Sequence, residues 1–172
     1  HPRILMQVFQ REHIVLCGVD EAIAVIKTCA FNPENITIHA LHDGDEVAPW
    51  ETLMTIEGDL ADFAHLETVY LGLLARQSRI ATNVRRAVEA ANGKQVLFFS
   101  ARYDSYLTQE QDGYAALIGG IKSFSTDANA AAAGVEGQTK TWFEVFKEAG
   151  DDVEKARKIY REQPLLKALD SA

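Results

Sequence analysis

The stretch HLETVYLGLLARQSRIAT, residues 65–82, decides how the fold of this chain is interpreted. Its first half predicts a core helix, because apolar residues recur there at helical spacing: Leu66, Val69, Tyr70, Leu73 and Leu74. Its second half is polar and contains Arg76, Ser78, Arg79 and Thr82. The flanking sequence continues the helical pattern over about 62–91, and Asn92-Gly93 gives a C-cap signal. One helix is therefore predicted to bury methyl groups first and to present guanidiniums and hydroxyls further on.

Strands of alternating character are predicted before this helix. They cover 4–9, 13–18, 36–41 and 51–58. A helix with the sequence DEAIAVIKTC separates the second strand from the third, and Asp20 is a plausible N-cap for it. The N-terminal part is thus predicted to be a mixed layer of strands and helices.

The order of elements changes after the long helix. Residues 95–101 are apolar on successive positions, which suits a strand covered on both faces, as in parallel sheets. A helix at 112–119, a short strand SFST and a helix DANAAAAG follow. Alternating strands and helices predict right-handed crossovers on a parallel sheet or barrel. With only two such strands, any barrel is unfinished.

The last residues are predicted to be helical and carry no recognisable chemistry. TWFEVFKEAG is amphipathic, Asp151 or Asp152 can cap the next helix, and Pro164 ends or kinks that helix. Glu154 with Lys158, and Lys158 with Glu162, are expected surface pairs. We expect three parts: an α/β sandwich-type domain at 1–93 that includes the long helix, a partial α/β-barrel segment at 94–136, and a C-terminal helical segment at 137–172.

The composition limits the classes of function. A chain of 172 residues is long enough for one domain with a core, or for a small domain joined to an incomplete second one. No apolar run can span a bilayer and the N-terminus lacks a secretory pattern, so a cytoplasmic protein is expected. The formal net charge of −8 argues against nucleic-acid binding, so any phosphate site must be local. Cys17 and Cys29 lack metal-ligand spacing and are expected to be buried thiols.

Four segments between residues 4 and 134 together carry a family resemblance. They are VLCGVDEAIAVIK, LHDGDEVAPWETLMTIEGDLADFAHLETVYLGLLARQSRIATNVRRAVEAANG, VLFFSARYD and DGYAALIGGIKSFSTDANAAAAG. In order and spacing they resemble the type II phosphoribosyltransferases, specifically the nicotinate phosphoribosyltransferase family, with quinolinate phosphoribosyltransferase as a more distant relative. The resemblance implies an α/β fold in which an N-terminal α/β sandwich feeds an open α/β barrel.

The same resemblance implies a function. Nicotinate and phosphoribosyl pyrophosphate would react to nicotinate mononucleotide and pyrophosphate, with magnesium, in NAD biosynthesis. The partners would be small anions: nicotinate, phosphoribosyl pyrophosphate or phosphate. In this family the long helix runs toward the barrel mouth, so Arg76 and Arg79 would face an anionic site, where a planar guanidinium matches phosphate and carboxylate oxygens. The alternative is that both arginines pair with Glu67, with Asp62 or with solvent.

Three further residues are candidates at the barrel mouth. Arg102 directly follows the apolar strand, where α/β barrels place their ligands, and the family commonly has an arginine there. The alternative is an ion pair with Asp104. Ser125 and Thr126 match the serine-containing second barrel strand of the family, and their hydroxyls could hold a phosphate or a ribose. Either could instead cap the following helix.

The sequence also departs from the family. Where a Gly-Thr-x-x-His segment is usual, GVEGQTKTWFEV stands, and no histidine follows His65. The later barrel strands, with their acidic metal ligands and phosphate loop, have no counterpart in these 172 residues. We therefore expect the lone chain to be inactive. It is either part of a phosphoribosyltransferase or a non-catalytic binding or assembly protein, and its unpaired sheet edges predict a homo-oligomer or a partner chain that supplies the missing barrel.

Overall fold

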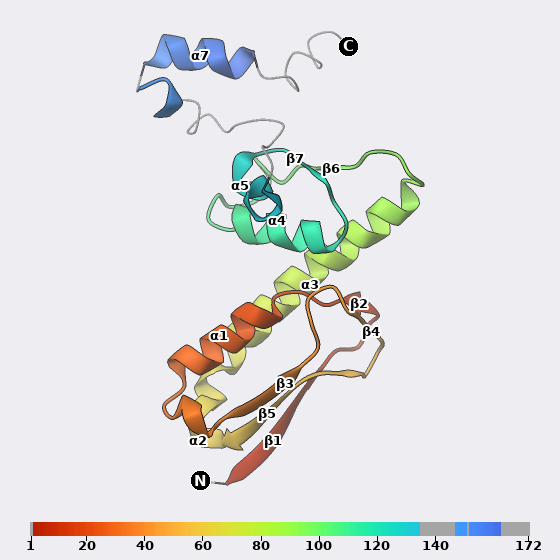
Figure 1. Cartoon of the computed structure of the whole chain (residues 1–172), viewed down its shortest axis with the longest axis vertical. Coiled ribbons are helices and arrows are strands. Elements are labelled where there is room, and N and C mark those ends of the chain that lie inside the picture. The colour runs from red at the N-terminus through yellow and green to blue at the C-terminus, as the bar shows by residue number, and fades with distance from the viewer. Residues whose placement is uncertain (1, 135–146, 151, 163–172) are drawn as a thin grey trace. The chain divides into compact units, whose positions relative to one another are not determined.

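The computed structural model describes residues 2–134, 147–150 and 152–162, and shows an α/β protein (Figure 1). The chain divides into two compact units, residues 1–86 and 87–172, called unit 1 and unit 2 below. Each unit is considered by itself. The three-part division expected from the sequence stays a prediction, because much of its last part lies outside the described residues.

Unit 1 contains an antiparallel sheet of three strands in the order β1-β5-β3. Strand β1 spans Arg3–Phe9, β3 spans Thr37–Ala40 and β5 spans Thr52–Asp59. The alternation along β1 follows the sequence, since every second residue turns toward the core. A second, smaller ladder pairs β2 (Ile14–Val15) with β4 (Glu46–Val47). All four predicted strands are therefore present, with β2 shorter than expected.

Helices cover one face of this sheet (Figure 1). They are α1 (Val19–Cys29), α2 (Leu60–Phe63) and α3 (Glu67–Ala90), with short 3-10 turns at Pro33–Asn35 and Ala64–Leu66. The core is formed by apolar side chains of α1, β1, β5 and the first turns of α3, including Ile26, Met54, Ile56, Tyr70 and Leu74.

Two details of the predicted helices are corrected. Helix α1 begins at Val19, so Asp20 lies in its first turn and is not the N-cap. The carboxylate of Asp43, from a distant loop, accepts a hydrogen bond from the Val19 N–H at 2.9 Å and satisfies the helix start instead. The long helix is interrupted near its start by the 3-10 turn Ala64–Leu66, and Asp59 caps α2 by accepting from the Ala61 N–H at 3.0 Å.

The end of α3 lies where the sequence predicted it. Asn92 and Gly93 both have positive φ, at 47° and 82°. The left-handed conformation ends the helix after Ala90, and Gly93 adopts it without steric cost.

Unit 2 contains the two predicted parallel strands, β6 (Leu97–Phe98) and β7 (Ser123–Phe124). Helix α4 (Gln109–Ile118) connects them, and α5 (Asp127–Ala130) with the turn Ala131–Ala133 follows. The parallel pairing confirms the crossover predicted from the alternation of strands and helices. A Cβ on Gly113 would lie 2.0 Å from the Asn129 carbonyl oxygen, so only glycine lets α4 approach α5 this closely.

The described part of the C-terminal segment contains helix α7 (Val153–Arg161). Asp152 caps it, accepting from the N–H groups of Glu154 and Lys155 at 3.0 Å each, as the sequence suggested. Glu154 pairs with Arg157 at 2.6 Å. Pro164 and most of TWFEVFKEAG lie outside the described residues. Among the residues that the structure describes, no helix is long and apolar enough to cross a membrane.

Candidate functional site

The hydroxyls in the polar half of α3 hold the β2 segment. Ser78 Oγ accepts from the Cys17 N–H at 3.0 Å and donates to the Cys17 carbonyl at 3.1 Å. Thr82 Oγ1 accepts from the Val15 N–H at 2.9 Å. Both side chains are buried, and they lie four residues apart, which places them on one face of the helix. The two hydroxyls therefore form hydrogen bonds that a neighbouring strand would otherwise provide. Without them, these backbone groups would be buried without partners.

Cys17 lies at the centre of this polar contact between α3 and residues 15–17. Its sulfur is 3.6 Å from Gln77 Oε1 and 4.0 Å from Asp43 Oδ2, and Gln77 in turn donates to the Glu21 carboxylate. Burial, together with the nearby carboxylate of Asp43, raises the pKa of the Cys17 thiol from 9.0 to about 12. Cys17 is thus the buried, neutral thiol that was expected, whereas Cys29 is exposed and that expectation was wrong.

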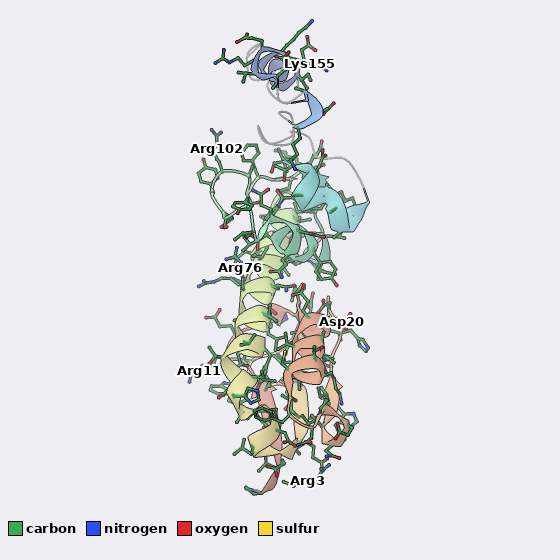
Figure 2. The ribbon with its side chains drawn as sticks, turned by 90° about the vertical axis from the view of Figure 1, so that its left-hand side faces the viewer. Arg3, Arg11, Asp20, Arg76, Arg102 and Lys155 are labelled. Carbon is green, nitrogen blue, oxygen red and sulfur yellow. The ribbon has the colours of Figure 1, made fainter. Side chains whose placement is uncertain are left out.

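The arginines of α3 lie on its exposed side. Arg76 and Arg79 are both exposed, and Figure 2 shows Arg76 and Arg11 projecting from one side of unit 1 while Asp20 projects from the opposite side. The carboxylate of Asp62, one of the alternative partners, is buried and accepts from Asn32 Nδ2 at 2.8 Å. Arg79 lines a groove of about 550 Å³ between α3 and the residues that follow β1.

Arg102 lies in unit 2, in the exposed loop between β6 and α4 (Figure 2). Its guanidinium carbon is 5.7 Å from the centre of the Phe99 ring and 6.0 Å from that of Tyr103, within the range of cation–π contact. The sequence predicted that Arg102 directly follows the strand, but β6 ends at Phe98, so the arginine lies four residues beyond the carboxyl end of this parallel strand.

Ser125 and Thr126 are buried in a network of side chains in unit 2. Three hydroxyl oxygens lie within hydrogen-bond distance of Asn129 Oδ1: Ser100 at 3.1 Å, Ser125 at 3.3 Å and Thr126 at 3.0 Å. The Asn129 Nδ2 donates to the Gln109 carbonyl at 2.7 Å, and Thr126 accepts from the Asn129 N–H at 3.2 Å as the cap of α5. The network therefore ties the end of β7 to α4, α5 and Ser100, two residues after the end of β6.

The candidates thus form two groups. Arg76 and Arg79 belong to α3 in unit 1, and Arg102, Ser125 and Thr126 belong to the strand ends in unit 2. Sequence reasoning did not find Asn129 and Gln109, which organise the second group. Their residue type was a signal, since side-chain amides often form hydrogen bonds with hydroxyls at the start of a helix. Nothing in the sequence pattern showed that Asn129 and Gln109 contact each other. The described residues contain no cluster of three or more His, Cys, Asp or Glu side chains suited to a metal ion, and we assign no step to magnesium.

The N-terminal part of the chain matches a known protein family. The model of "Quinolinate phosphoribosyl transferase, N-terminal domain" matches residues 1–78. Together with the relatives below, this match supports a quinolinate/nicotinate phosphoribosyltransferase-type family over this part of the chain, as the sequence resemblance indicated.

Individual relatives agree with the family match. The probable nicotinate-nucleotide pyrophosphorylase (carboxylating) of Methanothermobacter thermautotrophicus is 29% identical over 89 residues, which are 52% of this chain and 30% of that protein. The crystal structure of nicotinate-nucleotide pyrophosphorylase from Pyrococcus furiosus is similar with a TM-score of 0.72 and 29% identity, covering 93% of this chain and 41% of that one.

A more distant likeness concerns the fold alone. Human nicotinic acid phosphoribosyltransferase has 19% identity and a TM-score of 0.65, covering 87% of this chain and 37% of that one. The present chain therefore matches between 30% and 41% of the length of these relatives.

Proposed function

We propose that this chain carries part of a phosphoribosyltransferase that forms nicotinate mononucleotide, with nicotinate as the substrate. The family match and the names of the relatives support a related phosphoribosyltransferase. In the proposed reaction, the pyridine nitrogen bonds to the ribose carbon that carries the pyrophosphate, and the bond from that carbon to oxygen breaks. Pyrophosphate leaves with the electron pair.

The observation that carries the proposal is the position of Arg102. An exposed guanidinium near the carboxyl end of a parallel strand lies where α/β barrels bind ligands. Its fork of N–H groups suits a pyridine carboxylate or a phosphate, and the rings of Phe99 and Tyr103 beside it offer flat surfaces on which a pyridine could stack. Arg102 is proposed as a substrate contact.

Ser125 and Thr126 are proposed as positioning residues. Their hydroxyls are engaged by Asn129 and Gln109, so they fix the backbone at the end of β7. Catalysis of this kind depends on orientation and on stabilising charge that develops on the leaving group. A rigid strand end next to the Arg102 loop serves that purpose.

Calorimetry on the full chain tests the substrate contact. The chain should bind pyrophosphate and nicotinate in about the millimolar range, as expected for one or two charge-assisted contacts. Arg102→Gln should weaken both about tenfold, whereas Arg157→Gln, which removes an exposed arginine elsewhere in unit 2, should not. Absence of binding by the unchanged chain, or equal effects of the two variants, would overturn the proposal.

Competition and turnover sharpen the assignment. Nicotinate should compete with quinolinate for the same site and bind more tightly. If quinolinate binds more tightly, the proposed substrate is quinolinate and not nicotinate. We propose that the 172-residue chain alone does not catalyse the reaction, because it covers only 41% of the Pyrococcus furiosus relative. Formation of nicotinate mononucleotide by the pure chain with magnesium would contradict the proposed inactivity of the lone chain. The same result would support nicotinate as the substrate.

Association with a second chain is proposed as well. In unit 2, Tyr103, Tyr106 and Leu107 are large apolar side chains more than 70% exposed. Such surfaces mark contacts with other molecules. Light scattering at micromolar concentration should give at least a dimer, and Tyr106→Ser with Leu107→Ser should shift the mass toward the monomer. A monomer mass for the unchanged chain would contradict the proposal.

A further inference from the structure

The groove in unit 1 has an apolar floor and a polar rim. It lies between α3 and the residues at the end of β1, and its volume of about 550 Å³ is that of a small-molecule site. The apolar Val8, Leu53 and Leu74 form most of the buried floor. Ser78 and Thr82 also line the groove and are buried, with their hydroxyls bonded to the Cys17 and Val15 backbone. Leu71 and Ala75 extend this apolar surface along the helix. The groove therefore offers contact for an apolar body the size of one or two rings.

The rim of the groove on α3 is cationic. Arg79, Asn83 and Arg86 line it and follow one another at helical spacing, on one stripe of the helix. Arg79 makes no hydrogen bond or ion pair with another described residue. With the other described residues, Arg86 makes a single long hydrogen bond, of 3.5 Å to the His13 carbonyl. Among the described residues that line the groove, Glu12 is the single carboxylate, so these residues carry a net positive charge within a protein of net charge −8.

The opposite side of the groove contains a hydrogen-bond donor without an acceptor. Gln10 Nε2 is buried and has no hydrogen-bond partner within the part of the chain that the structure describes, although the Gln10 carbonyl accepts from the Trp50 N–H at 2.8 Å. A buried amide N–H without an acceptor costs free energy that a ligand oxygen would recover. Gln10 lines the same groove as Arg79 and Arg86.

We infer that this groove binds a small organic acid, with its carboxylate or phosphate between Arg79, Arg86 and Gln10 and its apolar body on the floor. The inference goes beyond the proposed function, because the groove lies wholly in unit 1 and does not involve Arg102. It also places Arg79 together with Arg86, an arginine that the sequence analysis did not single out.

The ligand class is tested with three probes on the full chain. Calorimetry with 2-naphthoate, the neutral 2-naphthamide and inorganic phosphate separates the apolar body from the charge. The acid should bind at least about tenfold more tightly than either of the other two, since only it uses both the floor and the rim. Equal binding of the amide, equal binding of phosphate, or no binding of the acid would each overturn the inference.

Matched variants locate the binding. Arg79→Gln should weaken 2-naphthoate about tenfold, while Arg85→Gln, which removes a neighbouring arginine that pairs with Glu46 at 3.3 Å outside the groove, should not. Ala75→Phe should fill the groove and abolish binding of 2-naphthoate. Ala75 is exposed, so the larger side chain is compatible with folding. Equal losses in the Arg79 and Arg85 variants would show a general charge effect and overturn the inference. Thermal unfolding verifies that each variant is folded.

Discussion

Buried polar side chains are found in both units, but they accompany very different apolar cores. In unit 1 the Ser78 and Thr82 hydroxyls lie beside a cluster of large side chains, including Phe63 and Tyr70. In unit 2 the buried apolar residues of the described part are mostly alanines, with Phe124 and Ile121 as the large ones. Unit 2 therefore depends more on its Asn129 network and on close backbone approach than unit 1 does on its hydroxyls.

The difference has a physical reason that bears on function. Apolar burial is proportional to area and tolerates small changes of shape, whereas a hydrogen-bonded network requires each partner in place. A unit built on such a network keeps its strand ends in one conformation. The candidate substrate contact Arg102 lies next to these strand ends, so rigidity is provided where the proposed chemistry needs it.

The largest effect is expected from Gly113→Ala. The added Cβ would meet the backbone of Asn129 at 2.0 Å, and a backbone atom cannot move aside as a flexible side chain can. We expect a loss of about 4 kcal/mol of unfolding free energy in unit 2. Hydrogen exchange measured by mass spectrometry should show it as faster exchange in α4 and α5, with unit 1 little changed.

Gly72→Ala is the matched control, because nothing lies within 4 Å of its added Cβ on α3. It should stabilise unit 1 by about 0.5–1 kcal/mol through helix propensity. Equal exchange in the two variants would mean that α4 and α5 are not packed as closely as described.

Asn129→Ala is expected to have the next largest effect, about 3 kcal/mol in unit 2. It removes the acceptor of the Ser100 hydroxyl and a donor to the Gln109 carbonyl, and buried groups left without partners are costly. Asn83→Ala, at an exposed position of α3, should change stability by less than about 0.5 kcal/mol. If denaturant unfolding gives similar losses of unfolding free energy for Asn129→Ala and Asn83→Ala, the network does not stabilise unit 2.

Much of this arrangement follows from sequence patterns, and the network shows where the patterns stop. Alternation predicted β1 and β5, and Asn92-Gly93 predicted the end of α3, because these signals are local. The capping role of Thr126 was also among the alternatives. The Asp43 contact to α1 was not predictable, since it joins residues 24 apart along the chain.

For α3 a usable signal was present. Tyr70, Leu74, Ser78 and Thr82 follow one another at four-residue spacing, so the two hydroxyls lie on the stripe that begins in the core. That spacing favours burial for Ser78 and Thr82 and exposure for Arg76 and Arg79. What they bond to could not be inferred, because the Cys17 and Val15 backbone is more than 60 residues away.

Thr82→Val tests the same kind of interaction in unit 1 and should cost about 2 kcal/mol. Valine keeps the shape of the side chain but leaves the Val15 N–H without an acceptor. The large core should keep unit 1 folded, so the loss should be smaller than that of Asn129→Ala. Thr68→Val, at an exposed site of the same helix, is the control in denaturant unfolding and should be nearly neutral. A loss larger than that of Asn129→Ala would reverse the comparison of the two units.

The smallest effect concerns pH and Cys17. Burial, with Asp43 nearby, raises the pKa of its thiol from 9.0 to about 12, so the folded state favours the neutral form. Below pH 9 the thiol is protonated in the folded and the unfolded chain, and the stabilisation is fully present. As the pH rises above 9, only the unfolded chain releases the proton, so stability is lost progressively until about pH 12.

At pH 10 this linkage amounts to about 1 kcal/mol. Between pH 8 and pH 10, denaturant unfolding of the unchanged chain should therefore lose about 1 kcal/mol more than that of Cys17→Ala, because the effects of other titrating groups cancel in the difference. Cys29→Ala, at the exposed cysteine, serves as the control for the loss of a thiol. An identical pH dependence in all three would show that the Cys17 thiol is accessible to water. The polar contact between α3 and residues 15–17 would then be open to solvent rather than a buried counterpart of the Asn129 network.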